Sequence, residues 1–229
     1  MRPTTLGNAS VTCPAVAARL ARNTDAALRK GDWTPERVYL PELRGRNLLI
    51  LGLGHIGAQL ARWGQFLEMK VTALTRNPSK ARDGKPAVHT LGALGDLAKH
   101  LGEADFIVVA IPSCPDTADL IGAREFHRMK KGAFLINVGR ARVVNEEALY
   151  EALRSRRIAG AGLDVWYQYP DPPGEKKFPS RFPFQELDNV IMTPHKPTIE
   201  TMEYRWGKIA ENIACFARGE ALSNVVFTA

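Results

Sequence analysis

Three glycines in the segment LILGLGHIGAQLARW (49–63) have the spacing of a phosphate-binding loop. Gly52, Gly54 and Gly57 follow an apolar run and precede a stretch that favours a helix. In such a loop the first glycine permits a tight turn, the second admits a pyrophosphate, and the third lets the helix pack on the strand. The anion then lies at the N-terminus of the helix. We therefore predict a dinucleotide site that includes His55 and Ile56 beside the three glycines.

The residues after the second predicted strand bear on which dinucleotide binds. An acid there would accept hydrogen bonds from the adenosine ribose and repel a 2′-phosphate. The strand at 70–75 ends in Thr75 and Arg76 instead, with no acid. A hydroxyl and a guanidinium can both bind a phosphate. The sequence thus favours NADP(H) over NAD(H), and the alternative is that Arg76 is a solvated loop residue.

Apolar strands alternate with helices along most of the chain. Strands are expected at 47–51, 70–75, 88–90, 106–111, 133–138, 162–165 and 190–192, and helices at 56–66, 94–101, 123–129 and 146–154, the last capped by Asn145. Continuous apolar strands that alternate with helices are typical of a parallel sheet covered on both faces. The pattern predicts an α/β fold with a Rossmann-type doubly wound parallel sheet.

Two further helices are expected near the ends of the chain. The first covers 15–30, where Gly31 can stop it. The second covers 198–218, and its apolar residues share one face, which we interpret as core packing in preference to a binding face. These residues are Met202, Trp206, Ile209, Ile213 and Phe216.

Composition argues against several classes of function. The net charge is +7, but the basic residues are scattered and no nucleic-acid motif is present. No apolar run has the length of a membrane span, and the first residues lack the apolar core of a secretory signal. Cys13, Cys114 and Cys215 are too far apart to suggest a disulfide framework or a metal site. We expect a cytoplasmic protein that binds neither nucleic acid, membrane nor metal.

Five segments, in order, resemble the D-isomer-specific 2-hydroxyacid dehydrogenases. They are LRGRNLLILGLGHIG, ADFIVVAIPSCPDTADLIG, MKKGAFLINVGRARVVNEEAL, IAGAGLDVW and NVIMTPH, and they cover most of residues 43–196. The resemblance implies an oxidoreductase acting on a CH–OH group. Hydride would pass between the nicotinamide and a small 2-oxoacid or 2-hydroxyacid, such as glyoxylate or hydroxypyruvate.

The resemblance also implies roles for individual residues. Arg140, in NVGR, matches the arginine that clamps the substrate carboxylate. His195, in MTPH, matches the histidine that exchanges a proton with the substrate oxygen. Asp164 matches a position near the nicotinamide end. The remaining residues expected along the cofactor are Ile111, Pro112, Val138 and Gly139.

Three departures from the family pattern favour an alternative function. The usual glutamate partner of the histidine is replaced by Tyr169, although Gln168 or Tyr169 could bond the imidazole. Lys196 and Pro197 replace small residues after His195. The resemblance also implies that the substrate lobe, which precedes the cofactor domain in the family, is missing. The alternative is a truncated or degenerate relative that binds NAD(P) without turnover, as a sensor or interaction module.

The resemblance divides the chain into three parts. Residues 1–42 would be a crossover and incomplete substrate-lobe segment, 43–196 the dinucleotide-binding domain, and 197–229 a helix that returns toward the substrate lobe. Remnants of a second lobe would therefore lie at both chain ends. Relatives commonly dimerise through the cofactor domain, so we expect a homodimer or association through exposed apolar surface.

Overall fold

The computed structural model describes residues 28–33, 42–79, 86–172, 174–195, 199–223 and 225. Most of the helix expected at 15–30 lies outside these residues, as do Lys196 and Pro197. Gly31, which is described, has a φ of +76° and donates its N–H to the carbonyl of Leu28. This conformation suits the helix stop that the sequence predicts at Gly31.

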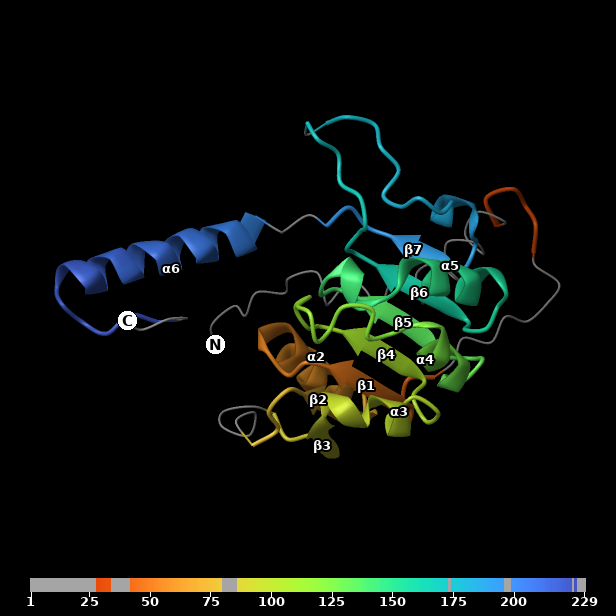
Figure 1. Cartoon of the computed structure of the whole chain (residues 1–229), viewed down its shortest axis with the longest axis horizontal. Helices are drawn as coiled ribbons and strands as arrows, with labels where there is room; N and C mark the ends of the chain where they lie inside the picture. The colour runs from red at the N-terminus through yellow and green to blue at the C-terminus, as the bar shows by residue number, and fades with distance from the viewer. Residues whose placement is uncertain are drawn as a thin grey trace. The chain divides into compact units, whose positions relative to one another are not determined.

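The described residues form a seven-stranded sheet in the order β3-β2-β1-β4-β5-β6-β7, and every pairing is parallel (Figure 1). The strands are β1 (Asn47–Leu51), β2 (Lys70–Thr75), β3 (Thr90–Ala93), β4 (Phe106–Val109), β5 (Phe134–Asn137), β6 (Gly160–Leu163) and β7 (Val190–Met192). The order turns back at β1, with β2 on one side and β4 on the other. This is the switch point at which doubly wound sheets bind ligands.

Helices cover both faces of the sheet, as the alternation predicts. The helices of the sheet unit are α2 (His55–Phe66), α3 (Leu97–His100), α4 (Ala123–Arg128) and α5 (Glu146–Arg154), with 3-10 turns η1 (Leu94–Asp96), η2 (Ala141–Val143) and η3 (Phe184–Glu186). A further helix, α6 (Ile199–Ala217), belongs to a separate unit. Leu48 and Ile50 of β1 pack in one cluster with α2, whereas Leu49 and Leu51 pack in the other with α3, α4 and α5. Successive side chains of a strand point to opposite faces, so one apolar strand contributes to both cores.

Local signals set most of these boundaries. Asn145 caps α5 by accepting the N–H of Ala148 at 3.0 Å, and Glu146 and Glu147 occupy its first turn. The strands expected at 47–51, 70–75 and 190–192 have the predicted bounds.

The bounds of the other strands differ from the prediction, because hydrogen bonding with neighbouring strands decides where each strand begins and ends. The strand expected at 88–90 lies at Thr90–Ala93, where Thr90 pairs with Thr72 of β2. The strand at 106–111 ends at Val109, and the one at 133–138 covers only Phe134–Asn137. The strand placed at 162–165 begins earlier, at Gly160, which pairs with Phe134 of β5. Glycine has low β-propensity, and burial between two neighbouring strands overrides it.

The described residues separate into two units, one that contains the sheet and ends at His195 and one that contains α6. The helix predicted at 198–218 is confirmed within one residue at each end. Its apolar residues are exposed, however, with 64% of Trp206, 65% of Ile213 and 76% of Phe216 accessible. The interpretation of this face as packed core is therefore wrong for these side chains. No helix in the described part of the chain is both long and apolar enough to cross a membrane.

Candidate functional site

The glycine loop has the geometry that its spacing predicts. Gly52 follows β1 with a φ of +98°, and a Cβ there would lie 2.7 Å from the carbonyl oxygen of Ala110. A Cβ on Gly57 would overlap the carbonyl oxygen of Gly52, so this glycine lets α2 start against the end of β1. A Cβ on Gly54 would meet nothing within 4 Å. Only the first and third glycines are therefore required by the protein's own packing.

The N-terminus of α2 suits an anion. Gly54 is the N-cap of α2, no side chain caps the helix, and its first turn carries no acid. The first N–H groups of a helix have no partner within it and carry partial positive charge. His55 and Ile56 belong to this turn, and both are exposed. Open space at Gly54 and an uncapped turn fit the pyrophosphate of a dinucleotide.

The end of β2 presents a cation beside the same edge of the sheet. The hydroxyl of Thr75 accepts the N–H of Asn77 at 3.1 Å. The guanidinium of Arg76 lies 3.1 Å from the Sγ atom of Cys114 and 3.9 Å from a carboxylate oxygen of Asp116. Arg76 thus contacts the loop that follows β4. The sequence predicts either a phosphate-binding or a solvated arginine, and neither prediction includes this contact.

The loop after β4 holds residues that sequence reasoning missed. Thr117, only 4% exposed, donates its hydroxyl to the carbonyl of Pro112 at 2.8 Å and accepts the N–H of Cys114 at 2.9 Å. Hydrogen bonding with Thr117, aided by the nearby Arg76, holds the pKa of the Cys114 thiol below its usual value despite some desolvation. The carboxyl ends of parallel strands meet at one edge of the sheet. This rule predicts that the loop after β4 lies near Arg76, which follows β2.

A tight turn after β5 presents Arg140. Asn137, 1% exposed, accepts the N–H of Gly139 and donates to the carbonyl of Arg140, both at 3.1 Å. A Cβ on Gly139 would lie 2.6 Å from the carbonyl oxygen of Ile111, so the turn packs directly on the segment after β4. The Arg140 side chain donates to the Gly139 carbonyl at 2.7 Å, and the residue is exposed. Val138, Gly139 and Ile111 are buried and Pro112 is exposed.

His195 lies in a hydrogen-bonded network after β7. The Tyr169 hydroxyl is 3.0 Å from Nδ1 of His195 and accepts the Trp166 N–H at 3.1 Å. The Trp166 indole donates to the carbonyl of Thr193 at 2.7 Å, and the Thr193 hydroxyl donates to Asp164 at 2.5 Å. The expectation that Tyr169 bonds the imidazole agrees with this geometry. The backbone N–H of Gln168 donates to the carbonyl of Pro179.

The predicted site residues therefore gather at one edge of the sheet. The glycine loop follows β1, Thr75 is the last residue of β2, and Arg76 comes directly after it. Ile111 and Pro112 follow β4, Arg140 follows β5, Asp164 follows β6, and His195 follows β7. Arg140 and His195 project from strands that flank β6. Both residues are exposed, and His195 has a φ of +51°, a conformation often found at functional sites when the residue is not glycine.

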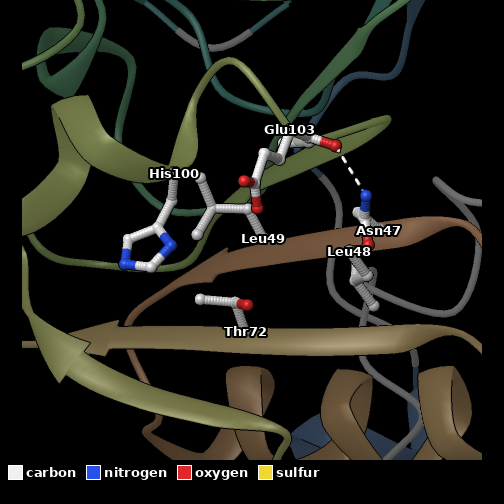
Figure 2. A pocket seen from close by; sticks show the side chains of 7 residues that line it. Asn47, Leu48, Leu49, Thr72, His100 and Glu103 are labelled. Atoms are coloured by element: carbon white, nitrogen blue, oxygen red, sulfur yellow. Dashed lines mark hydrogen bonds between the residues drawn. The ribbon is translucent and has the colours of Figure 1, made fainter.

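A pocket elsewhere on the sheet unit does not belong to this edge. Figure 2 shows it beside Asn47 and Leu49 of β1, Thr72 of β2, and His100 and Glu103, with the Asn47 amide donating to the Glu103 carbonyl at 2.8 Å. Asn47 is the first residue of β1, whereas the glycine loop follows the last. The pocket therefore contains none of the predicted site residues.

Comparison with known proteins identifies the family. The fold and the glycine loop define a Rossmann-type dinucleotide-binding domain. A family model described as "D-isomer specific 2-hydroxyacid dehydrogenase, NAD binding domain" matches residues 14–196. The chain belongs to this family, as the resemblance predicts. The match begins before residue 43, where the sequence placed the start of the domain.

Relatives and solved structures agree with this assignment. A glyoxylate reductase of Korarchaeum cryptofilum is 35% identical over 92% of this chain and 62% of its own length. A D-3-phosphoglycerate dehydrogenase of Archaeoglobus fulgidus is 34% identical over 92% of this chain and 38% of its own length. A D-isomer specific 2-hydroxyacid dehydrogenase from Xanthobacter autotrophicus, solved with NADPH and MES, has a TM-score of 0.75 and 32% identity, covering 94% of this chain and 84% of that one. The chain thus spans less than two thirds of the two curated relatives.

Proposed function

We propose that this chain is the cofactor-binding part of an NADP-preferring oxidoreductase that reduces a small 2-oxoacid to a 2-hydroxyacid. The observation that carries the proposal is the gathering of the glycine loop, Arg140 and His195 at one edge of the parallel sheet. Sheets of this class bind their ligands outside the carboxyl ends of the strands. The curated names of relatives include a glyoxylate reductase, and we propose a substrate of that size, such as glyoxylate or hydroxypyruvate.

The preference for NADP(H) rests on the end of β2. Thr75 and Arg76 would hold the 2′-phosphate, because a guanidinium forms charge-assisted hydrogen bonds with phosphate oxygens. No acid occupies the position that would bind a ribose 2′-hydroxyl and repel the phosphate. The pyrophosphate would lie at Gly54, His55 and Ile56, on the uncapped first turn of α2.

Arg140 and His195 would act on the substrate. The planar guanidinium of Arg140 suits a carboxylate, which it would orient beside the carbonyl to be reduced. His195 would give the carbonyl oxygen its proton from Nε2, since Nδ1 is held by Tyr169. The nicotinamide, when bound, supplies the hydride. Ile111, Pro112, Val138, Gly139 and Asp164 would line its end of the site.

A second candidate function is dinucleotide binding without turnover. The observation that favours it is the phenol of Tyr169, which stands where a carboxylate would pair with His195. A neutral hydroxyl stabilises a protonated imidazole less than a carboxylate does. Such a chain would act as a sensor or an interaction module. We further propose a cytoplasmic protein that self-associates, and the exposed apolar residues of α6 support the latter.

The test is the consumption of NADPH with a panel of 2-oxoacids, followed by NADPH absorbance. We expect only slow consumption with glyoxylate or hydroxypyruvate, because Arg140 and His195 are exposed to water. His195→Asn should reduce it further, by about 100-fold or more, because general acid catalysis contributes that much. Arg140→Ala should raise KM strongly, while both variants still bind NADPH. Binding of NADPH without consumption of any 2-oxoacid would favour the second candidate.

A further inference from the structure

The contact between Arg76 and the loop after β4 joins two strand ends on either side of the glycine loop. Arg76 follows β2, Cys114 and Asp116 follow β4, and β1 lies between these strands in the sheet. The guanidinium lies 3.1 Å from Sγ of Cys114 and 3.9 Å from Oδ2 of Asp116. The residue proposed to bind the 2′-phosphate therefore already faces an anion of the protein.

The loop holds Asp116 in a defined place. The buried hydroxyl of Thr117 bonds Pro112 and Cys114, and the carbonyl of Cys114 accepts the N–H groups of Thr117 and Ala118. These bonds fix the chain on both sides of Asp116. Its carboxylate remains accessible, with 82% of the side chain exposed, as is 69% of the Arg76 side chain.

We infer that Asp116 is a cofactor-selectivity residue whose carboxylate competes with the 2′-phosphate of NADP(H) for Arg76. The inference rests on the proposed function of the end of β2. Asp116 would weaken NADPH binding in two ways. It occupies the guanidinium that the phosphate would use, and its charge repels the phosphate that approaches Arg76. NADH carries a 2′-hydroxyl, so Asp116 would weaken NADPH binding selectively.

The size of the effect follows from exposure. A solvent-exposed ion pair contributes about 0.2–1 kcal/mol, which corresponds to a factor of about 1.4–5 in affinity. Repulsion of the phosphate adds to this factor. Exposed charges are screened by salt, so the effect should decrease as ionic strength rises.

The test is a titration of the full chain with NADPH and NADH, read by cofactor fluorescence at low salt. Asp116→Asn should bind NADPH about threefold more tightly or better, with NADH changed less than about twofold. The gain should be smaller in salt, and smaller when Asp116→Asn is combined with Arg76→Ala. Asp188→Asn is the matched control, since Asp188 is an exposed acid paired with another arginine, Arg156. It should change neither affinity.

Several results would overturn the inference. Weaker NADPH binding by Asp116→Asn would mean that Asp116 aims Arg76 at the phosphate. An equal gain for NADPH and NADH, or an equal gain in the Arg76→Ala background, would indicate a general charge effect. A wild-type chain without NADPH preference would contradict the proposed preference alone, and an NADPH-specific gain in Asp116→Asn would still support the role of Asp116. A chain that binds neither dinucleotide would overturn both proposals.

Discussion

His195 has a phenol hydroxyl within hydrogen-bond distance of its Nδ1 atom. Tyr169 is fixed on its other side by the N–H of Trp166, so the ring and hydroxyl are held toward the imidazole. In the proposed reaction the histidine gives its proton to the carbonyl oxygen, and a negative charge beside an imidazole favours the protonated form. If the chain has the proposed function, residue 169 is therefore the position at which the pH range of reduction can be changed.

We predict that Tyr169→Glu extends reduction to higher pH. A carboxylate at this distance favours the charged imidazole, so the alkaline limb of kcat/KM should move upward by about one pH unit. Tyr169→Phe removes the hydrogen bond without adding charge and is the matched control. A limb at the same pH in Tyr169→Glu and wild type would show that residue 169 does not control His195.

For individual residues, the sequence predicts which residue type a position needs better than it predicts which residues contact each other. The glycine spacing predicts that Gly52 and Gly57 must lack a side chain, and the structure shows close contacts at both that exclude one. Nothing in the local sequence places Asp116 near Arg76, because the contact joins positions 40 residues apart. Such a pairing depends on the order of the strands and on the loop that Thr117 folds.

Variants of the glycine loop and α2 can separate effects on dinucleotide affinity from effects on the stability of the fold. We predict that Gly54→Ala retains the stability of the wild type, since a Cβ there meets nothing within 4 Å. The added methyl group would occupy the space left for the pyrophosphate, so dinucleotide affinity should fall by about tenfold or more. Thermal unfolding and a NADPH titration measure the two effects.

Gly57→Ala is the contrasting variant. Its Cβ would overlap the carbonyl oxygen of Gly52, so α2 or the loop must move. Overpacking of this kind costs about 1–3 kcal/mol. We therefore expect Gly57→Ala to lose both stability and affinity, and equal stability of the two variants would contradict the packing described for α2.

The start of the central strands depends on a carboxylate. Asp105, before β4, accepts the N–H of Asn47 at 2.8 Å and pairs with Lys130 at 2.9 Å. Burial raises the pKa of Asp105, but the hydrogen bonds of Asn47 and Lys130, with the charges of Lys130 and Arg46, outweigh it and leave the pKa below its usual value. The ionised carboxylate therefore stabilises the folded chain.

We predict that Asp105→Asn lowers the free energy of unfolding by about 1.5–3 kcal/mol at neutral pH, the usual range for hydrogen bonds to charged groups. A group with a lowered pKa contributes in full above its unfolded value, and its contribution disappears as pH falls through the folded value. The difference between wild type and variant should thus be constant above about pH 5 and decrease below about pH 4. Urea unfolding across this range measures it, and a difference that persisted in acid would contradict the ionic contribution.

Strand bounds were predictable where apolar runs were long and turn signals clear. Asn47–Leu51 and Lys70–Thr75 are such runs, and both were predicted correctly. The edge strand β3 was displaced in the prediction because its sequence, TLGA, has little β-propensity of its own. Its position follows from pairing with β2, which no local pattern encodes.

For the whole molecule, fold class was the most predictable property. Continuous apolar strands separated by helices allow few arrangements other than a doubly wound parallel sheet. The surroundings of α6 were less predictable. A repeat of apolar residues indicates one apolar face but not what covers it, and Trp206, Ile213 and Phe216 are exposed.

We propose above all that the carboxyl edge of this sheet binds NADPH, with Arg76 at its 2′-phosphate. Calorimetric titration of the full chain with NADPH and with NADH tests it most directly. We expect one saturable site per chain and binding of NADPH about tenfold tighter than that of NADH, which is the contribution of one charge-assisted contact. Absence of saturable binding, or tighter binding of NADH than of NADPH, would contradict it.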